Sequence, residues 1–404
     1  MSQLIRKSRQ HWVVVGAALV LTFGAATASA LGLTDNPDLR PSAAAGAGGS
    51  ATASSRPATR PTPTLAPGTH PVKFGLNYAD SLLTEPQSEI LERLQDAVVV
   101  GAEWIRVDLP WDLVQPINDL TYDWTDFDRV VTTAHSLGLE VDAILDATPY
   151  WDVSSSCKKG ISDTEFCPPD DTDFAKFARA AALRYQSEVG SWEIWNEPNI
   201  SQRWWPFPNA ADYAQLLTTV AQSIRSVDPH AFILMGGLAA VPDSSALGYV
   251  SQNTFLTSVV KIKGSMADVN AISYHPFSAP TPASTAGDYL DISGSPGNML
   301  SILQANGDSK VQIWVTESGA TEYDGAVEPA GTAATAAQAQ AQAAYATDLV
   351  KTVSTNPNVA ADFWFSDQDI PSEDLYWGLR DANGVARPVF DTFKAAITAC
   401  GCSR

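Results

Sequence analysis

Two glutamates stand out because each closes a short apolar run with a group that can do acid–base chemistry. Glu197 lies in the segment WEIWNEPN, and Glu317 lies in the segment WVTESG. Two carboxyl groups that flank a glycosidic bond can cleave it, one as proton donor and the other as nucleophile. These roles need opposite protonation states, so the two carboxyls must sit in different environments. The segments therefore predict one site assembled from two distant parts of the chain.

Eight strand-like runs provide the elements that must position these residues. They are Val72–Tyr78, Glu103–Trp111, Leu139–Trp151, Ser191–Asn199, Ala231–Ala240, Val269–Phe277, Val311–Gly319 and Ala361–Asp367. Segments with the apolar spacing of helices separate the runs, and such alternation predicts an α/β fold, the (β/α)8 TIM barrel. An open doubly wound sheet is the alternative, but no glycine-rich phosphate turn follows the first run.

Polar residues gather where the predicted strands end. They are Asn77, Asp108, Asp146, Asn196, Glu197, His275, Glu317 and Asp367. The carboxyl ends of the strands form the active face of a TIM barrel. Because the fourth and seventh strands lie across the mouth of such a barrel, we expect Glu197 and Glu317 to face each other.

Five motifs in order carry a family resemblance. They are E-x-W-N-E-P-N at 193–199, Y-H at 274–275, T-E-S-G at 316–319, W-F-S-D at 364–367 and Y-W-G-L at 376–379. Together they resemble clan A of the glycoside hydrolases, most closely family 39 and its relatives, over roughly residues 72–395. The resemblance implies a retaining O-glycosyl hydrolase that acts on a polysaccharide or oligosaccharide by double displacement, with no cofactor and no metal.

The resemblance also implies roles for residues at matching positions. Glu197 is expected to be the acid/base and Glu317 the nucleophile. Asn196 is expected to bind the sugar 2-hydroxyl, and Arg106 to hydrogen-bond the nucleophile and keep it ionised. For Arg106, a structural ion pair in the core is the alternative.

Three further residues complete the predicted site. His275 and Tyr274 end the sixth run, and one of them, His275 in preference, is expected to orient a catalytic carboxylate. Trp364 resembles the aromatic floor under the reacting sugar. Plain packing is the alternative for His275 and Trp364. Glu193 shares a strand face with Glu197, one layer deeper, and is expected to support the site as a buried, paired carboxylate.

Two other functions remain open at this point. A non-catalytic carbohydrate-binding barrel would be favoured if either Glu197 or Glu317 were replaced, and neither is. A metal-dependent hydrolase needs several histidines at strand ends, and only His275 is well placed. The motifs identify neither the sugar nor the choice between exo and endo action.

The N-terminus has the layout of an export signal. Basic residues precede the apolar run Trp12–Gly24, and the small-residue pattern Ala28-Ser29-Ala30 follows. Residues 1–30 are therefore expected to be a signal peptide, or an uncleaved membrane anchor, because Val13–Leu33 carries no charge. Both alternatives predict a secreted protein or one on the extracellular face of the cell envelope.

Residues 31–71 are rich in Pro, Ala, Ser, Thr and Gly, which predicts a disordered linker before a catalytic domain at 72–404. The chain carries a net charge of −20, of which residues 1–70 contribute +4. A nucleic acid or an anionic membrane surface needs clustered cations, so neither is expected as a partner. We expect a monomer whose partner is its carbohydrate substrate.

Four cysteines fit an oxidising compartment. Cys157 and Cys167 lie in one predicted loop and are expected to form a disulfide. A disulfide between Cys400 and Cys402 would be strained by their close spacing, so their pairing stays open.

Overall fold

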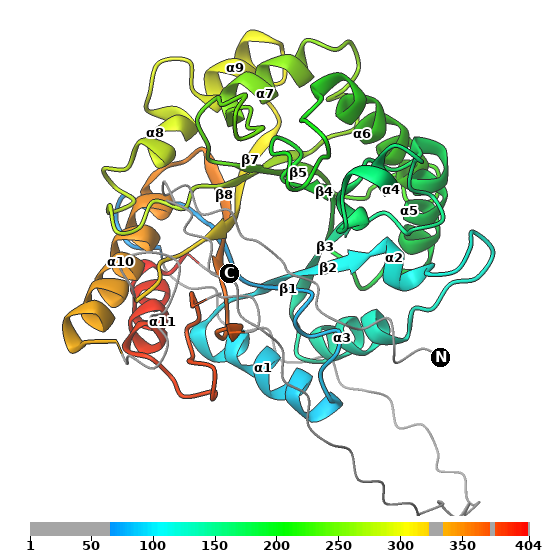
Figure 1. The fold of residues 1–404 in the computed structure, drawn as a ribbon. Helices are drawn as coiled ribbons and strands as arrows, with labels where there is room; N and C mark the ends of the chain where they lie inside the picture. Colours follow the sequence, from blue (N-terminus) through cyan, green and yellow to red (C-terminus); the bar gives the residue numbers. More distant parts are fainter. Residues whose placement is uncertain (1–64, 323–333, 372–375, 403–404) are drawn as a thin grey trace, which may run out of the picture. The chain divides into compact units, whose positions relative to one another are not determined.

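The strands of the protein form a closed parallel barrel in which each strand pairs with the next and β8 pairs with β1. The computed structural model describes residues 65–322, 334–371 and 376–402. The strands are β1 (Lys73–Ala79), β2 (Trp104–Pro110), β3 (Glu140–Asp146), β4 (Ser191–Asn196), β5 (Ile233–Ala239), β6 (Ala271–His275), β7 (Gln312–Ser318) and β8 (Val359–Phe365). Figure 1 shows them at the centre of a ring of helices. The predicted TIM barrel is confirmed.

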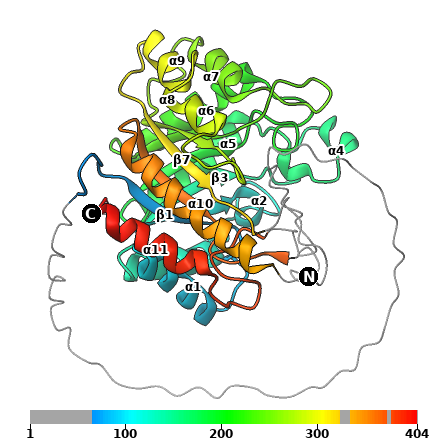
Figure 2. The same cartoon turned by 90° about the vertical axis from the view of Figure 1, so that its left-hand side faces the viewer.

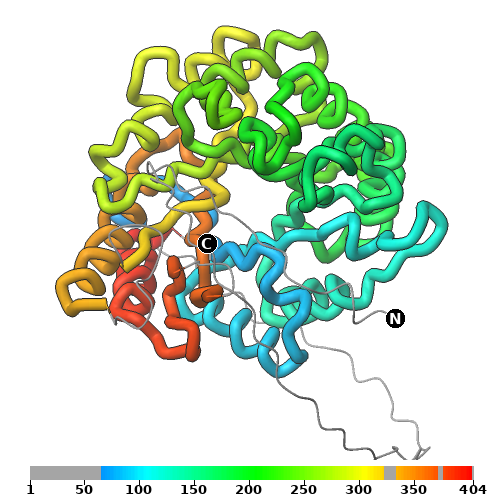
Figure 3. Tube along the Cα trace, viewed as in Figure 1, coloured from blue at the N-terminus to red at the C-terminus, as the bar shows by residue number. Residues whose placement is uncertain are grey.

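Helices follow the strands and cover the outside of the barrel. They are α1 (Gln87–Val100), α2 (Trp111–Val114), α3 (Thr125–Ser136), α4 (Cys157–Gly160), α5 (Asp171–Tyr185), α6 (Ala210–Arg225), α7 (Gln252–Val260), α8 (Gly287–Ser293), α9 (Met299–Ala305), α10 (Ala336–Thr355) and α11 (Pro388–Cys400). In Figure 3 the colours run around the ring in chain order, as a barrel of successive strand–helix units requires.

Apolar side chains fill the barrel interior at the amino ends of the strands. Trp314 stacks against Phe232 and Phe363, with ring centroids 5.1 and 6.1 Å apart. Gly75 leaves room for this layer, because a Cβ at Gly75 would lie 2.3 Å from the ring of Phe363. The interior is thus packed at the amino ends of the strands, which leaves the polar side chains to the carboxyl ends.

The helix ends follow the sequence signals for capping. Gly101 ends α1 with a φ of 90°, which glycine adopts without strain. At α10, the Thr335 side chain accepts from the backbone of Gln338, whose own side chain accepts from the Thr335 backbone. This reciprocal capping box satisfies two amide groups at the helix start.

Both pairs of cysteines form disulfides. Cys157 pairs with Cys167 in the loop after β3, as predicted. Cys400 pairs with Cys402 at the end of α11, the pairing that the sequence left open.

Contacts with the barrel domain begin before the residue at which composition places the end of the linker. The backbone amide of Ala66 donates to the carbonyl of Cys400. The His70 backbone and ring contact the carbonyls of Ser354 and Val359, at distances between 2.7 and 3.0 Å. Figure 2 shows this blue segment beside the end of α11. Residues 1–64, which hold the predicted signal or anchor and most of the linker, lie outside the described residues.

None of the helices that the structure describes is long and apolar enough to cross a membrane. The predicted anchor segment falls outside the part of the chain to which this finding applies.

These contacts predict where the chain can be shortened. A protein that starts at Leu65 should melt at the same temperature as one that starts at Leu31, since residues 31–64 offer little apolar surface. A protein that starts at Pro71 loses the His70 contacts and should melt a few degrees lower, at about 1 kcal/mol per hydrogen bond and 2–4 °C per kcal/mol. Calorimetry of the three proteins checks this. Equal melting of all three would mean that the His70 contacts add nothing.

Candidate active site

The fourth strand presents two consecutive polar residues to the barrel mouth because its alternation is interrupted. Trp192 and Ile194 pack against the helix layer, as does the ring of Trp195, which lies 5.9 Å from that of Phe174. Trp195 has a φ of 71° and Glu197 a φ of 48°, a backbone region that non-glycine residues rarely adopt. Such strain persists only where the surroundings enforce it, and it is common at active sites.

Arg106 of β2 connects the two strands that carry the glutamates. Its guanidinium donates to Glu193 through Nε and Nη2, at 3.0 and 2.8 Å. Nη2 also donates to Asn196 Oδ1 at 3.0 Å, and Nη1 donates to Glu317 Oε1 at 2.7 Å. Glu193 accepts a further hydrogen bond from the amide of Gly237. Glu193 is thus the buried, paired carboxylate beneath the site that the strand alternation predicted.

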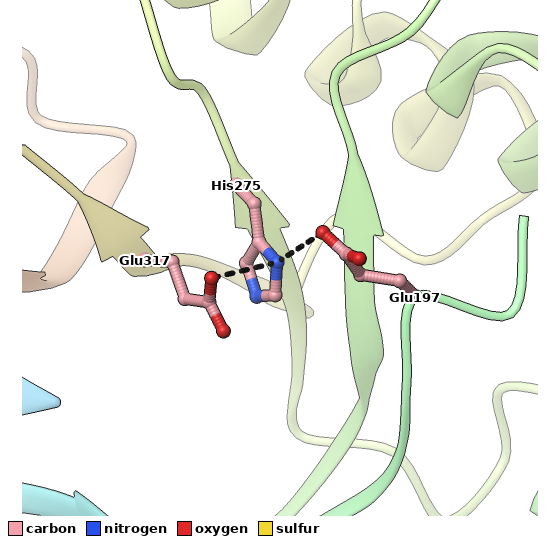
Figure 4. Close-up of side chains that lie close together, drawn as sticks. All are labelled: Glu197, His275 and Glu317. Atoms are coloured by element: carbon pink, nitrogen blue, oxygen red, sulfur yellow. Dashed lines mark hydrogen bonds and ion pairs between the residues drawn. The ribbon is translucent and has the colours of Figure 1, made fainter. Parts of the chain in front are cut away.

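His275 of β6 lies between the two glutamates, as Figure 4 shows. Its Nδ1 is 3.1 Å from Glu197 Oε1 and 3.6 Å from Glu317 Oε2, and its Nε2 is 3.1 Å from the hydroxyl of Thr316. Gly237 makes room for the ring, because a Cβ there would lie 2.1 Å from Nε2. His275 therefore holds both carboxylates in place, and Thr316 holds His275.

The distance between the two carboxyls distinguishes two kinds of sugar chemistry. One carboxylate oxygen of Glu197, one of Glu317 and a ring nitrogen of His275 lie within 4.8 Å of one another. Carboxyls about 5–5.5 Å apart leave room for attack by a carboxylate, whereas about 6.5–9.5 Å is needed to admit a water between carboxyl and sugar. The separation fits direct attack.

The environment of Glu317 keeps this carboxyl ionised. Burial alone would raise its pKa, but His275 and Arg106 outweigh burial and lower the pKa below the ordinary value of 4.5. An anion with such support is suited to nucleophilic attack at neutral pH.

A different cation adjoins Glu197. Arg203, in the loop after β4, places Nε 3.9 Å from Glu197 Oε2, and its guanidinium lies 4.6 Å from the ring centre of Phe166. This contact could not be predicted from the sequence, because Arg203 lies in a loop whose path depends on the barrel around it.

Glu197, His275 and Glu317 are also the cluster of three potential metal ligands found among the described residues. The donor set suits a metal poorly, because both ring nitrogens of His275 already have partners within 3.1 Å. Arg106 and Arg203 further supply the positive charge that a cation would bring. The geometry favours carboxylate chemistry.

Two predicted site residues face away from the mouth. Tyr274 is fully buried toward the helices, and its hydroxyl donates to the carbonyl of Asp288 at 3.1 Å. Trp364 is fully buried as well, with its ring 5.4 Å from that of Phe393 in α11. The expected aromatic floor is therefore not formed by Trp364, which has the packing role given as its alternative, and Tyr274 orients no catalytic carboxylate. Side chains alternate along a strand, and these two have the outward parity.

The same parity identifies an aromatic residue that the sequence reasoning missed. Phe363 points into the barrel, so Phe365, two residues on, has the inward face that was assigned to Trp364. Phe365 contacts Phe277 and belongs to a small cluster with Trp377 above the apolar layer. The alternation of buried residues in β8 could have indicated it.

Other polar residues at strand ends have separate tasks. Asp367, after β8, accepts two hydrogen bonds from Arg93 of α1, at 2.7 and 2.6 Å, and so joins strand to helix. Asp108 and Asp146 lie close together at the ends of β2 and β3. Burial, and then the charge of Asp146, raise the pKa of Asp108 well above 3.8.

Comparison with known proteins places this chain in a family. The family model Cellulase (glycosyl hydrolase family 5) matches residues 78–364, more than half of the chain. A search of curated protein sequences returned no significant match.

Solved structures share the fold at low sequence identity. A family 39 glycoside hydrolase from Bacteroides cellulosilyticus WH2 aligns with a TM-score of 0.62 and 18% identity, over 83% of this chain and 65% of its own. A monomeric β-xylosidase from Caulobacter crescentus CB15 aligns with a TM-score of 0.62 and 17% identity, over 82% and 69%. Xylanase 10B from Thermotoga maritima aligns with a TM-score of 0.56 and 14% identity, over 82% and 97%.

The chain thus spans less than two thirds of the length of the first of these structures. The neighbours include the family 39 fold suggested by the motifs, whereas the matching family model is that of family 5, and both families belong to clan A. The chain belongs to the Cellulase family, glycosyl hydrolase family 5, a family of clan A.

Proposed function

We propose that the protein is a retaining glycoside hydrolase, secreted or held at the extracellular face of the cell envelope, that cleaves a polysaccharide or oligosaccharide. The observation that carries the proposal is the pair of carboxyls of Glu197 and Glu317, which approach each other within 4.8 Å through one oxygen each, with Glu317 held ionised. The basic, apolar and small-residue segments of the N-terminus support export.

In the first step, Glu317 Oε2 attacks the anomeric carbon while Glu197 gives its proton to the leaving oxygen. The carbon–oxygen bond of the glycoside breaks, and an ester bond to Glu317 forms. Glu317 Oε1 stays bound to Arg106 at 2.7 Å, which leaves Oε2 as the attacking atom. Asn196, oriented by Arg106 through its Oδ1, has its amide nitrogen available for a sugar hydroxyl.

In the second step, a water molecule attacks the anomeric carbon and Glu197 takes the water proton. The ester bond breaks, and Glu317 returns to its ionised form beside Arg106. His275 can donate from Nδ1 to whichever carboxylate carries the charge, because both lie within 3.6 Å of that nitrogen. The product keeps the configuration of the substrate, since the anomeric carbon is attacked twice.

The stereochemistry of the first product tests the proposal. Xylan, cellulose and mannan oligosaccharides and their 4-nitrophenyl glycosides are offered, and the first-formed anomer is read by proton NMR. The retained anomer is expected, with equal activity in EDTA. An inverted anomer would contradict double displacement, and loss of activity in EDTA would favour a metal at Glu197, His275 and Glu317.

A further inference from the structure

A groove of about 360 Å³ lies beside the mouth of the barrel, outside the carboxylate site. Its walls come from three loops, which follow β3, β4 and β5. The residues that matter for the argument are Ile161, Ser201, Gln202, Trp205, Phe207 and Leu247. Phe207 is 60% exposed and Leu247 is 55% exposed, so the groove presents apolar side chains to solvent.

The groove is held by packing that fixes its walls. Trp205 lies over Gly160, where a Cβ would be 2.1 Å from the indole, and it packs on the cluster around the Cys157–Cys167 disulfide. On the other side, the amide of Ser201 donates to the carbonyl of Gly248 at 2.9 Å. The ring of Phe207 lies beside Gly248. These contacts preform the groove.

The chemistry of the lining selects a neutral ligand. No residue that lines the groove is ionisable, although the chain as a whole carries a charge of −20. Exposed aromatic and aliphatic side chains bind flat apolar faces, and the Ser201 hydroxyl and the Gln202 amide can bond to hydroxyl groups. A neutral sugar has both features, an apolar ring face and a rim of hydroxyls.

The groove adjoins the residue that handles the leaving group. The amide of Ile200 donates to the carbonyl of Glu197, and the chain enters the groove at Ser201. Four residues span at most about 14 Å. Arg203, between the two groove residues Gln202 and Trp205, reaches back to Glu197 Oε2 at 3.9 Å. The loops that form the groove therefore lie on the Glu197 side of the barrel mouth.

We propose that this groove is a binding site for neutral sugar units on the leaving-group side of the cleaved bond, with Phe207 as its stacking platform. The proposal rests on the assignment of Glu197 as the acid/base. It gives the enzyme a preference for chains that extend beyond the cleaved bond on this side. Remote binding of this kind lowers the activation free energy for cleavage of long substrates and has no effect on short ones.

Phe207→Ala tests the groove. The probes are β-1,4-linked xylo-, cello- and manno-oligosaccharides of two to six units and the matching monoglycosyl fluorides. For the longer oligosaccharides, kcat/KM should fall about 10-fold, the effect of one aromatic contact. Leu247→Ala should lower the same values less. The loss should vanish for the monoglycosyl fluorides, whose leaving group is a single atom and does not reach the groove.

Leu183→Ala is the matched control, because Leu183 is 56% exposed on α5 and lies outside the groove. It should leave kcat/KM unchanged for both the oligosaccharides and the monoglycosyl fluorides. An unchanged kcat/KM on oligosaccharides in Phe207→Ala, or an equal loss on the monoglycosyl fluorides, overturns the proposal.

Calorimetric binding of the hexasaccharides to Glu317→Gln separates this proposal from the assigned chemistry. Binding that weakens about 10-fold when Phe207→Ala is added supports the groove whatever the catalytic roles are. Hydrolysis that fails in the wild-type enzyme while this binding persists overturns the proposed function and leaves a sugar-binding groove.

Discussion

Glu317→Ala is expected to abolish turnover of every glycoside, with kcat lowered about 10⁴-fold or more. Without the Glu317 carboxylate no ester to the sugar can form, so even an activated leaving group cannot be expelled by this route. Rates on 4-nitrophenyl and natural glycosides should fall together. Azide should restore activity by attacking in place of Glu317, and the glycosyl azide should have the inverted configuration.

Glu197→Ala is the counterpart, and its effect should depend on the leaving group. Natural glycosides need the proton from Glu197, so their rates should fall about 10²–10⁴-fold. A 4-nitrophenyl group leaves without it, so the glycosyl-enzyme should form and accumulate because its hydrolysis lacks a base. Azide should release it as the retained glycosyl azide, read by NMR. Azide products of the opposite configurations would exchange the roles of Glu197 and Glu317.

Asp362→Asn is expected to stabilise the protein at alkaline pH and to have little effect in acid. Asp362 of β8 points toward the helices, fully buried, and neither carboxyl oxygen has a hydrogen-bond partner. Burial raises its pKa to about 7, from an ordinary value of 3.8, and the nearby hydroxyl of Ser318, which donates to the carbonyl of Phe363 at 3.1 Å, offsets only part of this rise.

The sign follows from where the proton is held. Between pH 3.8 and about 7, Asp362 is protonated in the folded protein and ionised in the unfolded chain, so rising pH lowers the free energy of unfolding. Above pH 7 the ionised Asp362 lowers the free energy of unfolding by its full amount, about 4 kcal/mol at most. Asparagine cannot ionise and removes this pH dependence.

Urea unfolding at pH 5 and pH 8 measures the effect. The stability gain of Asp362→Asn over wild type should be larger at pH 8 than at pH 5. Asp391→Asn, on the exposed side of α11, is the matched control for loss of a carboxylate and should show no such difference. The same gain at both pH values would mean that Asp362 is already ionised in the folded protein at pH 5.

The sequence was sufficient for the barrel and for bringing Glu197 and Glu317 together. Eight runs of apolar residues with helical segments between them leave few topologies, and the topology carries strand ends to one face. Their closure into a barrel with Arg106 and His275 at the centre follows from the inward positions of β2 and β6.

What failed was the face to which a strand-end residue points. Tyr274 and Trp364 have the right types and lie beside the right residues, but a shift of one position turns a side chain to the other face of the sheet. The interruption at Trp195 shows why motif letters are insufficient, because there a positive φ lets Asn196 and Glu197 share one face.

The paths of the loops also could not be predicted from the sequence. Arg203 and the groove around Phe207 depend on three segments from separate parts of the chain, and their meeting depends on the closed barrel. The contacts of His70 could not be predicted for a related reason. A proline-rich composition gives no indication that one histidine contacts two backbone carbonyls of the barrel domain.

The hydrogen bonds of Ala66 and His70 also determine how the enzyme can be mounted. They hold the first described residues at the end of α11 and the start of β8, at the amino ends of the strands, while the carboxylates lie at the carboxyl ends. A bead, an electrode or a fused partner attached ahead of Leu65 would therefore be joined to the barrel at the amino ends of the strands. The mouth would face the bulk liquid, which is the orientation that an insoluble substrate requires.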